Sequence, residues 1–340
     1  MSTVETPNTV TTPNGARSEA APGTIPVENP ATGEVIGYIE ELGSEQVATL
    51  VERARRAQPE WEARCFEGRA EVMYELRRWL IDNRERVVRT VVAENGKTRE
   101  DALLAELWYV CDSLGFWAKK APGYLADEGV RPHSPFLLGK KIIVRHRPYG
   151  VAGVIAPWNY PLTLGFGDAI PALMAGNSVV IKPSEWAPLA TLLMAEGLEA
   201  AGLPADVMLV ATGAGETGAA LIDHADMIMF TGSPATGRKV MARAAERLIP
   251  VSLELGGKDP MIVLEDANLE RAANMAVQWA MSNSGQICMS IERVYVEEPV
   301  YDEFVSKVVA KTRLLRQGVP GEAGAVEVGA LTFPPRIGRR

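Results

Sequence analysis

Five short apolar runs in the middle of the chain set the strongest limit on its fold. They cover residues 151–156, 178–182, 207–211, 227–230 and 251–255. The runs begin roughly 20 to 30 residues apart, and stretches of helical periodicity separate them. Short strands that alternate with helices are typical of a parallel sheet, whose ligands bind at the carboxyl ends of the strands. The sequence therefore predicts an α/β fold with its functional site at that edge.

The segments before these runs differ in texture. Residues 1–24 are rich in Thr, Pro and Ser and lack an apolar core, so we expect a disordered tail and no targeting peptide. Residues 25–135 carry apolar positions at helical spacing from Ser44 onwards. Residues 136–150 alternate between apolar and charged side chains, which favours an exposed strand or arm.

The segment after the runs has the pattern of a second α/β unit. Residues 257–340 contain two further apolar runs, near 261–264 and 293–296, and each is followed by a stretch of helical periodicity. We therefore expect a boundary between two domains close to residue 256.

The composition of the 340 residues excludes several classes of function. A net charge of −8 provides no basic surface for nucleic acid or anionic lipid, so neither is an expected partner. No apolar run reaches the ~18 residues that a membrane-spanning helix needs. Three cysteines without a CxxC pair and three histidines predict neither a disulfide framework nor a metal site. We expect a protein of the cytoplasm.

Glycines follow one of the predicted strands in a pattern that has two interpretations. Gly213 to Gly218 spell GxGxxG between a strand and a helix, as in dinucleotide-binding turns. Arg238 and Lys239 occupy the region where such turns have an acidic residue for the ribose. The segment is either a plain tight turn or a turn whose glycines let a cofactor approach.

Two other strand ends carry groups that suit an anionic or hydroxylated ligand. Gly232 and Ser233 precede a predicted helix whose free N–H groups suit a phosphate, although any capped helix start has the same pattern. Lys182 and Glu185 follow a buried run, and taken alone they are more typical of a solvated loop.

Cys288 is the candidate nucleophile of the chain. A thiolate there would be stabilised by free backbone N–H groups in a loop, whereas an inert core position is the alternative that we expect for Cys65 and Cys111. No histidine stands near Cys288 in the sequence, so the base is expected to be a carboxylate. Glu254, just before a Gly-Gly pair, is the candidate.

Five motifs, taken in order, resemble the NAD(P)-dependent aldehyde dehydrogenase superfamily over about residues 26–332. They are Pro157-Trp158-Asn159-Tyr160-Pro161, Lys182-Pro183-Ser184-Glu185, Phe230-Thr231-Gly232-Ser233, Leu253-Glu254-Leu255-Gly256-Gly257-Lys258 and Gly285-Gln286-Ile287-Cys288. The resemblance implies a cofactor domain with a Rossmann-type parallel sheet at 151–256 and its helical N-terminal part at 25–135. It also implies an arm of the oligomerisation region at 136–150 and an incomplete catalytic domain at 257–340.

The resemblance implies a catalytic role for three residues. Cys288 would attack an aldehyde, and the side-chain N–H of Asn159 with the backbone N–H of Cys288 would hold the oxyanion. Hydride transfer to NAD(P) would leave a thioester. Glu254 would then activate the water that hydrolyses it.

The resemblance also implies a set of cofactor-binding residues. They are Lys182 and Glu185 at the adenosine ribose, Ser233 and Gly232 at a phosphate, and Trp158 and Gly213 in the walls of the cofactor cleft. We expect NAD rather than NADP, because the carboxylate of Glu185 accepts ribose hydroxyls and repels a 2′-phosphate, while Lys182 alone would tolerate one.

The chain departs from the family pattern in two places. Asp168 stands nine positions after Asn159, where the family commonly has a lysine. The family pattern therefore does not say which residue relays protons in this chain. The chain also ends at Arg340, before the rest of the family's catalytic domain. We interpret it as truncated, and expect weak NAD binding, poor solubility and negligible turnover until the missing region is restored.

Three functions stay open at this point. A hydrolytic aldehyde dehydrogenase is favoured by Cys288, Glu254 and Asn159, whereas a CoA-acylating enzyme would lack the base that Glu254 supplies. An inactive nucleotide-binding relative is the third. Residues 289–293 and Asp168 resemble a branch similar to succinate-semialdehyde dehydrogenase, and a homo-oligomer is expected when the full-length chain is present.

Overall fold

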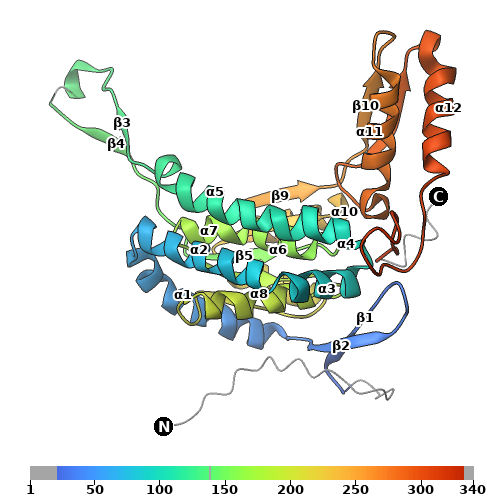
Figure 1. Cartoon of the computed structure of the whole chain (residues 1–340). Coiled ribbons are helices and arrows are strands. Elements are labelled where there is room, and N and C mark those ends of the chain that lie inside the picture. The colour runs from blue at the N-terminus through green and yellow to red at the C-terminus, as the bar shows by residue number, and fades with distance from the viewer. Residues whose placement is uncertain (1–20, 138, 333–340) are drawn as a thin grey trace.

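The computed structural model describes residues 21–137 and 139–332, and a five-stranded parallel sheet forms its centre (Figure 1). The strands are β5 (Val151–Ile155), β6 (Ser178–Lys182), β7 (Met208–Val210), β8 (Met227–Gly232) and β9 (Val251–Leu255). The predicted α/β fold is confirmed, and each predicted run contains a strand whose ends lie within about two residues of the expected ones.

The order of the strands fixes where a ligand can bind. The sheet runs β7-β6-β5-β8-β9, with every neighbouring pair parallel. The chain therefore builds outwards from β5 in one direction, returns, and continues from β8 in the other. The carboxyl ends of β5 and β8 flank the point where this direction reverses, and such switch points are where open α/β sheets bind ligands.

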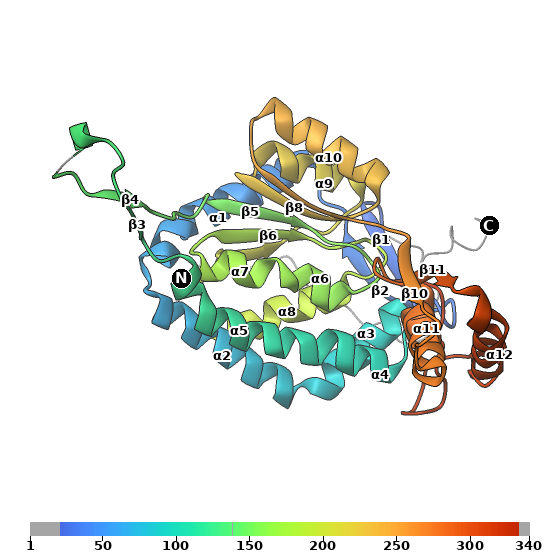
Figure 2. The same cartoon turned by 90° about the horizontal axis from the view of Figure 1, so that it is seen from above.

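Helices cover both faces of the sheet (Figure 2). One face packs against α1 (Ser44–Ala63), α9 (Gly215–His224) and α10 (Pro234–Glu246). The other packs against α2 (Phe66–Asp82), α5 (Tyr109–Tyr124), α6 (Pro161–Gly167), α7 (Ala169–Met174) and α8 (Leu189–Ala200), with α3 (Arg84–Asn95) and the short α4 (Arg99–Asp101) beyond them.

Alternation along the strands explains these two layers. In β6, Val180 belongs to the apolar cluster with α1 and α9, whereas Val179 and Ile181 belong to the cluster on the opposite face. Successive side chains of a strand point to opposite faces, so a strand that is apolar throughout is buried on both. Neither face is left for a ligand, which directs binding to the edge of the sheet.

Two antiparallel hairpins lie outside the sheet. β1 (Thr24–Glu28) pairs with β2 (Val35–Glu40) in a hairpin that was not predicted from the sequence. β3 (Glu128–Val130) pairs with β4 (Ile142–Val144) in an arm that projects from the body (Figure 1). The exposed strand expected around Ile142 is therefore present, while the predicted domain boundaries stay predictions.

A smaller unit follows β9. Its strands β10 (Asp259–Val263) and β11 (Ile291–Val296) are parallel, and α11 (Leu269–Met281) connects them, with α12 (Tyr301–Thr312) after β11. Val263, Ala273 and Phe304 are buried together in its core. Both strands and both helices expected in this second α/β unit are present, and they rise at one end of the molecule in Figure 1.

The prediction that Cys65 is buried is wrong, and the predictions for the two ends of the chain fall partly outside the described residues. Cys111 is buried in α5, but Cys65 is exposed, because it stands at the cap position between α1 and α2 rather than inside a helix. Residues 1–20 of the predicted tail and the chain after Thr332 lie outside the described residues, and Thr24 already belongs to β1.

Candidate active site

The carboxyl edge of the sheet gathers the predicted site residues from neighbouring strands. Ile155, the last residue of β5, pairs with Lys182 on one side and with Phe230 on the other. One strand further along, Thr231 of β8 pairs with Glu254 of β9. The turn that carries Trp158 and Asn159 therefore leaves the sheet at the switch point.

Lys182 ends β6 as a buried cation. Its Nζ lies 3.2 Å from Oε2 of Glu185, and only 5% of the residue is exposed. A Cβ added to Gly218 in α9 would lie 3.8 Å from Lys182 Cδ, so the stem of the lysine packs beside that helix. Burial lowers the pKa of Lys182, and the Glu185 carboxylate partly offsets this. The solvated-loop interpretation is therefore wrong for Lys182.

The first glycine of the GxGxxG segment is required by the backbone. Gly213 has a φ of +142°, and a Cβ there would collide with the side chain of Thr217. The Thr217 hydroxyl in turn donates 2.8 Å to the backbone carbonyl of Leu42, which fixes the turn to the segment after β2. Gly215 has open space around its Cβ position. The geometry thus explains Gly213 as a tight-turn glycine and leaves its approach to a cofactor a prediction.

Ser233 caps the helix that follows β8. Its Oγ accepts a hydrogen bond of 3.2 Å from the backbone N–H of Thr236, and Pro234 occupies the first position of α10. Gly232 lies against the Phe230 ring, where a Cβ would come within 2.5 Å of Cζ. The exposed start of α10 therefore combines a short residue with free helical N–H groups, as a phosphate needs.

The candidate nucleophile lies in a turn beside the Asn159 amide. Cys288 is exposed and follows the 3-10 turn η3 (Ser282–Gly285). Two residues before it, the Gln286 carbonyl accepts a hydrogen bond of 2.9 Å from Nδ2 of Asn159. An amide carries two N–H donors, and this bond uses one of them. The structure therefore brings Asn159 and the Cys288 loop together.

Glu254 lies on the strand that leads past the same loop. A Cβ placed on Gly257, three residues after Glu254, would lie 3.6 Å from the carbonyl oxygen of Cys288. Glu254 also acts electrostatically on Asp168, which stands between α6 and α7. Burial, and then the charge of Glu254, raise the pKa of Asp168 to about 6. The site thus contains two neighbouring carboxyl groups where the family pattern led us to expect a carboxylate and a lysine.

Sequence reasoning missed a layer of buried polar residues beneath the site. Lys97 and Glu106 are fully buried and form an ion pair of 2.6 Å, and Asn95 donates 2.8 Å to the backbone carbonyl of Trp158. The available signal was Asn-Gly-Lys directly after an apolar helical pattern, with a glutamate nine residues later. Such a charge pattern does not reveal burial, because charged residues are mostly exposed.

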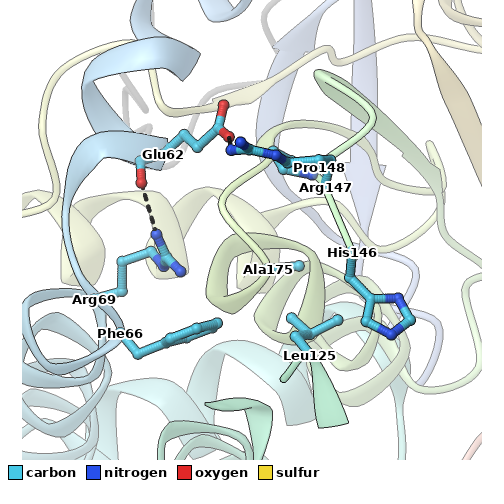
Figure 3. Close-up of a pocket in the computed structure, with 8 residues that line it drawn as sticks. All are labelled: Glu62, Phe66, Arg69, Leu125, His146, Arg147, Pro148 and Ala175. Carbon is cyan, nitrogen blue, oxygen red and sulfur yellow. Dashed lines mark hydrogen bonds and ion pairs between the residues drawn. The ribbon is translucent and has the colours of Figure 1, made fainter. Parts of the chain in front are cut away.

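A hollow at the opposite edge of the sheet is unrelated to these residues (Figure 3). Arg147 and Ala175 line it, and they precede β5 and β6, so it lies at the amino ends of the strands. Its charged groups bind the protein itself, since Arg69 donates to the carbonyls of Glu62 and Met174 while Arg147 pairs with the Glu62 carboxylate. We therefore do not place the active site there.

Residues 21–137 and 139–332 contain neither a membrane-spanning helix nor a cluster of metal ligands. In this part of the chain no helix combines the length and apolarity needed to cross a membrane. The same residues hold no group of three or more His, Cys, Asp or Glu placed to bind a metal ion.

Comparison with known proteins finds the same family throughout. A family model described as the aldehyde dehydrogenase family matches residues 17–337. A relative from Mycolicibacterium smegmatis, named "Putative succinate-semialdehyde dehydrogenase (NADP(+))", is 42% identical over 292 residues, which are 86% of this chain and 56% of the relative.

Two solved structures illustrate the similarity of the fold. Lactaldehyde dehydrogenase from Escherichia coli has a TM-score of 0.87 at 35% identity, covering 94% of this chain and 66% of the other. PnpE in complex with nicotinamide adenine dinucleotide has a TM-score of 0.88 at 32% identity, covering 92% and 64%. This chain therefore spans between half and two thirds of the length of these proteins.

Proposed function

Because the chain belongs to the aldehyde dehydrogenase family, we propose that it carries the thiol and the cofactor edge of an enzyme that oxidises an aldehyde to a carboxylic acid with NAD(P). The hydrogen bond from Asn159 to Gln286 carries this proposal, because it holds an amide donor beside the loop of Cys288. The chain spans only part of its relatives' length, so the activity is proposed for the protein as a whole.

Each step of the reaction has a residue in this site. The Cys288 sulfur forms a bond to the aldehyde carbon, and the resulting oxyanion is held by the remaining N–H of Asn159 and the backbone N–H of Cys288. A nicotinamide, when bound, accepts the hydride that leaves this carbon. Glu254 then removes a proton from water, the hydroxide adds to the thioester, and the acid departs as the C–S bond breaks.

The residues at the sheet edge fit a dinucleotide. The Glu185 carboxylate and the buried ammonium of Lys182 suit ribose hydroxyls, and the capped start of α10 at Ser233 suits a phosphate. At Gly213 and Gly232 the side chains of Thr217 and Phe230 occupy the space that a Cβ would need. We assign these two glycines and Trp158 to the walls of the cofactor cleft.

We propose three further properties of the whole protein: its assembly, its location and its substrate. The exposed β3–β4 hairpin supports an arm that pairs subunits of a homo-oligomer, and three free cysteines favour the cytoplasm. The name of the M. smegmatis relative supports succinate semialdehyde as the first substrate to test.

The deciding experiment removes the thiol. In the whole protein, Cys288→Ala should abolish formation of NAD(P)H from a panel of aldehydes, because the thiol provides the covalent route. The exposed Cys65→Ala serves as the matched control and should retain the rate of the whole protein without a substitution. Turnover by Cys288→Ala at the unchanged rate would refute the proposal. CoA-dependent release of the product would instead indicate an acylating enzyme.

A further inference from the structure

A buried lysine holds the backbone of the turn that carries Asn159. The Nζ of Lys97 has no solvent exposure and lies 2.6 Å from Oε1 of Glu106 and 2.9 Å from the backbone carbonyl of Asn159. The same ammonium lies 3.8 Å from the ring centroid of Tyr160. Lys97 therefore hydrogen-bonds to the backbone of Asn159 and lies over the ring of Tyr160. These two contacts fix the turn.

Glu106 extends this contact to the helix that follows. Its second oxygen, Oε2, accepts hydrogen bonds from the backbone N–H groups of Leu162 and Thr163, at 3.1 and 2.7 Å, in the first turn of α6. Glu106 itself projects from η1 (Ala102–Trp108), a π-helical segment. π-Helical segments are rare in proteins, but those that occur often lie at functional sites. Such a segment displaces a side chain from the position that an α-helix would give it.

Asn283 connects the same carbonyl to the thiol loop. Its Nδ2 donates 2.9 Å to the carbonyl of Asn159 and 3.3 Å to that of Gln286. Its backbone N–H donates 3.0 Å to Oδ2 of Asp101, and it adopts a φ of +48°, which is unusual for a side-chain-bearing residue. The backbone carbonyl of Asn159 thus accepts hydrogen bonds from Lys97 and Asn283, while the side-chain amide of Asn159 donates to Gln286.

A buried ion pair of this kind is a poor source of stability. The desolvation of two charges commonly exceeds their attraction, and an apolar pair of similar volume is often as stable. Burial lowers the pKa of Lys97, while the Glu106 carboxylate opposes this. The pair instead fixes the orientation of the turn, because the ammonium binds one backbone carbonyl and the carboxylate binds two backbone N–H groups.

We propose that Lys97 and Glu106 are positioning residues that aim the Asn159 amide at the oxyanion formed on Cys288. The inference rests on the proposed function, because it concerns the same thiol. It assigns neither residue a contact with the substrate.

The test compares two reactions of Cys288 that differ in their need for an oxyanion site. p-Nitrophenyl acetate acylates a thiolate through a tetrahedral oxyanion, in which a C–S bond forms and p-nitrophenolate leaves, and no cofactor is needed. Iodoacetamide alkylates the same sulfur by displacing iodide and forms no oxyanion. Both rates are measured at Cys288 by mass spectrometry. Their ratio separates the effect of the orientation of the Asn159 amide from the effect of the accessibility of the thiol.

Three variants of the 340-residue chain give the expected pattern. Lys97→Met and the double variant Lys97→Met/Glu106→Gln should each slow acylation roughly 10- to 100-fold, as a small misplacement of a reacting group does. Alkylation should change less than about 3-fold, since it needs no aimed donor. The control Arg99→Met removes the exposed pair with Glu85 in the same segment and should change neither rate.

Two results would overturn the inference. One is acylation at the unchanged rate in either folded variant. The other is an equal loss of both rates in the double variant, which leaves no unpaired buried charge, because this would show a merely structural role.

A second measurement separates this inference from the proposed function. If the unchanged chain is alkylated at Cys288 but is never acylated, the proposed function fails, and hydrogen exchange then decides the positioning. The double variant should exchange the amides of residues 160, 162–164 and 286–288 at least about 10-fold faster while β5 and β6 stay protected. Unchanged exchange in both segments would show that Lys97 and Glu106 do not hold the turn.

Discussion

The carboxyl group of Asp168 lies within electrostatic reach of Glu254, and this neighbour adds to the effect of burial on its acidity. The two residues come from different parts of the fold, the junction of α6 and α7 and the edge strand β9. A lysine in the place of Asp168 would attract Glu254, whereas Asp168 repels it when both are ionised. The chain therefore combines the proposed base with a second acid.

This pair predicts a stability that falls as the pH rises. Asp168 has a pKa of about 6 in the folded protein against 3.8 unfolded, so it favours the folded state below about pH 4 and loses that contribution between pH 4 and 6. Asp168→Asn should then be more stable than the unchanged protein above pH 6, by about 1 to 3 kcal/mol. Urea unfolding at pH 4.5 and pH 7.5 measures the difference.

Asp223→Asn is the control of opposite sign. The guanidinium of Arg243 lowers the pKa of Asp223, so that carboxylate stabilises the fold above its unfolded pKa and loses the effect as the pH falls. Its replacement should destabilise the protein nearly as much at pH 4.5 as at pH 7.5, and less once the pH falls below the unfolded value of 3.8. If Asp168→Asn showed the same trend as Asp223→Asn, the raised pKa that burial and then Glu254 give Asp168 would be wrong.

Glu254→Gln should separate the two halves of the proposed reaction. Formation of the thioester needs the thiol and the cofactor, whereas its hydrolysis needs a base for water. In the whole protein we therefore expect a burst of NAD(P)H close to one per Cys288, followed by turnover at least roughly 100-fold slower than without the substitution. Stopped-flow fluorescence measures both phases, and a steady rate equal to that of the unchanged protein would assign the base to another group.

Glu185→Gln should shift the choice of cofactor. The carboxylate repels a 2′-phosphate, and its neutral amide does not, while Lys182 keeps its place at the end of β6. We expect the ratio of Kd values for NADP and NAD, measured by fluorescence titration, to fall by roughly 10-fold. An unchanged ratio would show that Glu185 does not face the ribose, and a preference for NADP in the unchanged protein would contradict the expectation of NAD.

The GxGxxG segment predicts opposite results at two glycines. Gly213→Ala places a Cβ against Thr217 at a φ of +142°, and should cost about 1 to 3 kcal/mol and weaken binding of NAD(P). Gly215→Ala, two positions on, meets open space at the start of α9 and should be nearly neutral or slightly stabilising. Thermal unfolding of both variants checks this, and equal losses of stability would contradict the turn geometry.

The central strands of the sheet could be predicted from sequence because burial on both faces produces a short continuous apolar run. Ser178 to Lys182 reads as a strand since all five residues are buried, and the same holds for most of β5. The β1–β2 hairpin left a weaker trace, because Pro26 and Gly37 interrupt its short alternation.

The candidate site divides in the same way. Residues at strand ends, such as Asn159 and Glu254, stand out because strand ends follow apolar runs. Lys97 and Glu106 could not be found this way, since they lie in helical stretches where charged residues normally face water, and their burial depends on residues far away in the chain.

The hydroxyl of Thr332 donates 2.5 Å to the carbonyl of Asn95 across 237 positions of the chain, and its backbone N–H donates 2.9 Å to the side chain of Gln286. Thr332, which binds Gln286 in the thiol loop, is therefore synthesised long after Asn95, the last residue of α3. At a synthesis rate of about 5 to 20 residues per second, the ribosome needs roughly 10 to 50 s between these two residues. The strands of the sheet and the loop of Cys288 are made within that interval, so the sheet edge can be assembled before Thr332 is made and binds Gln286.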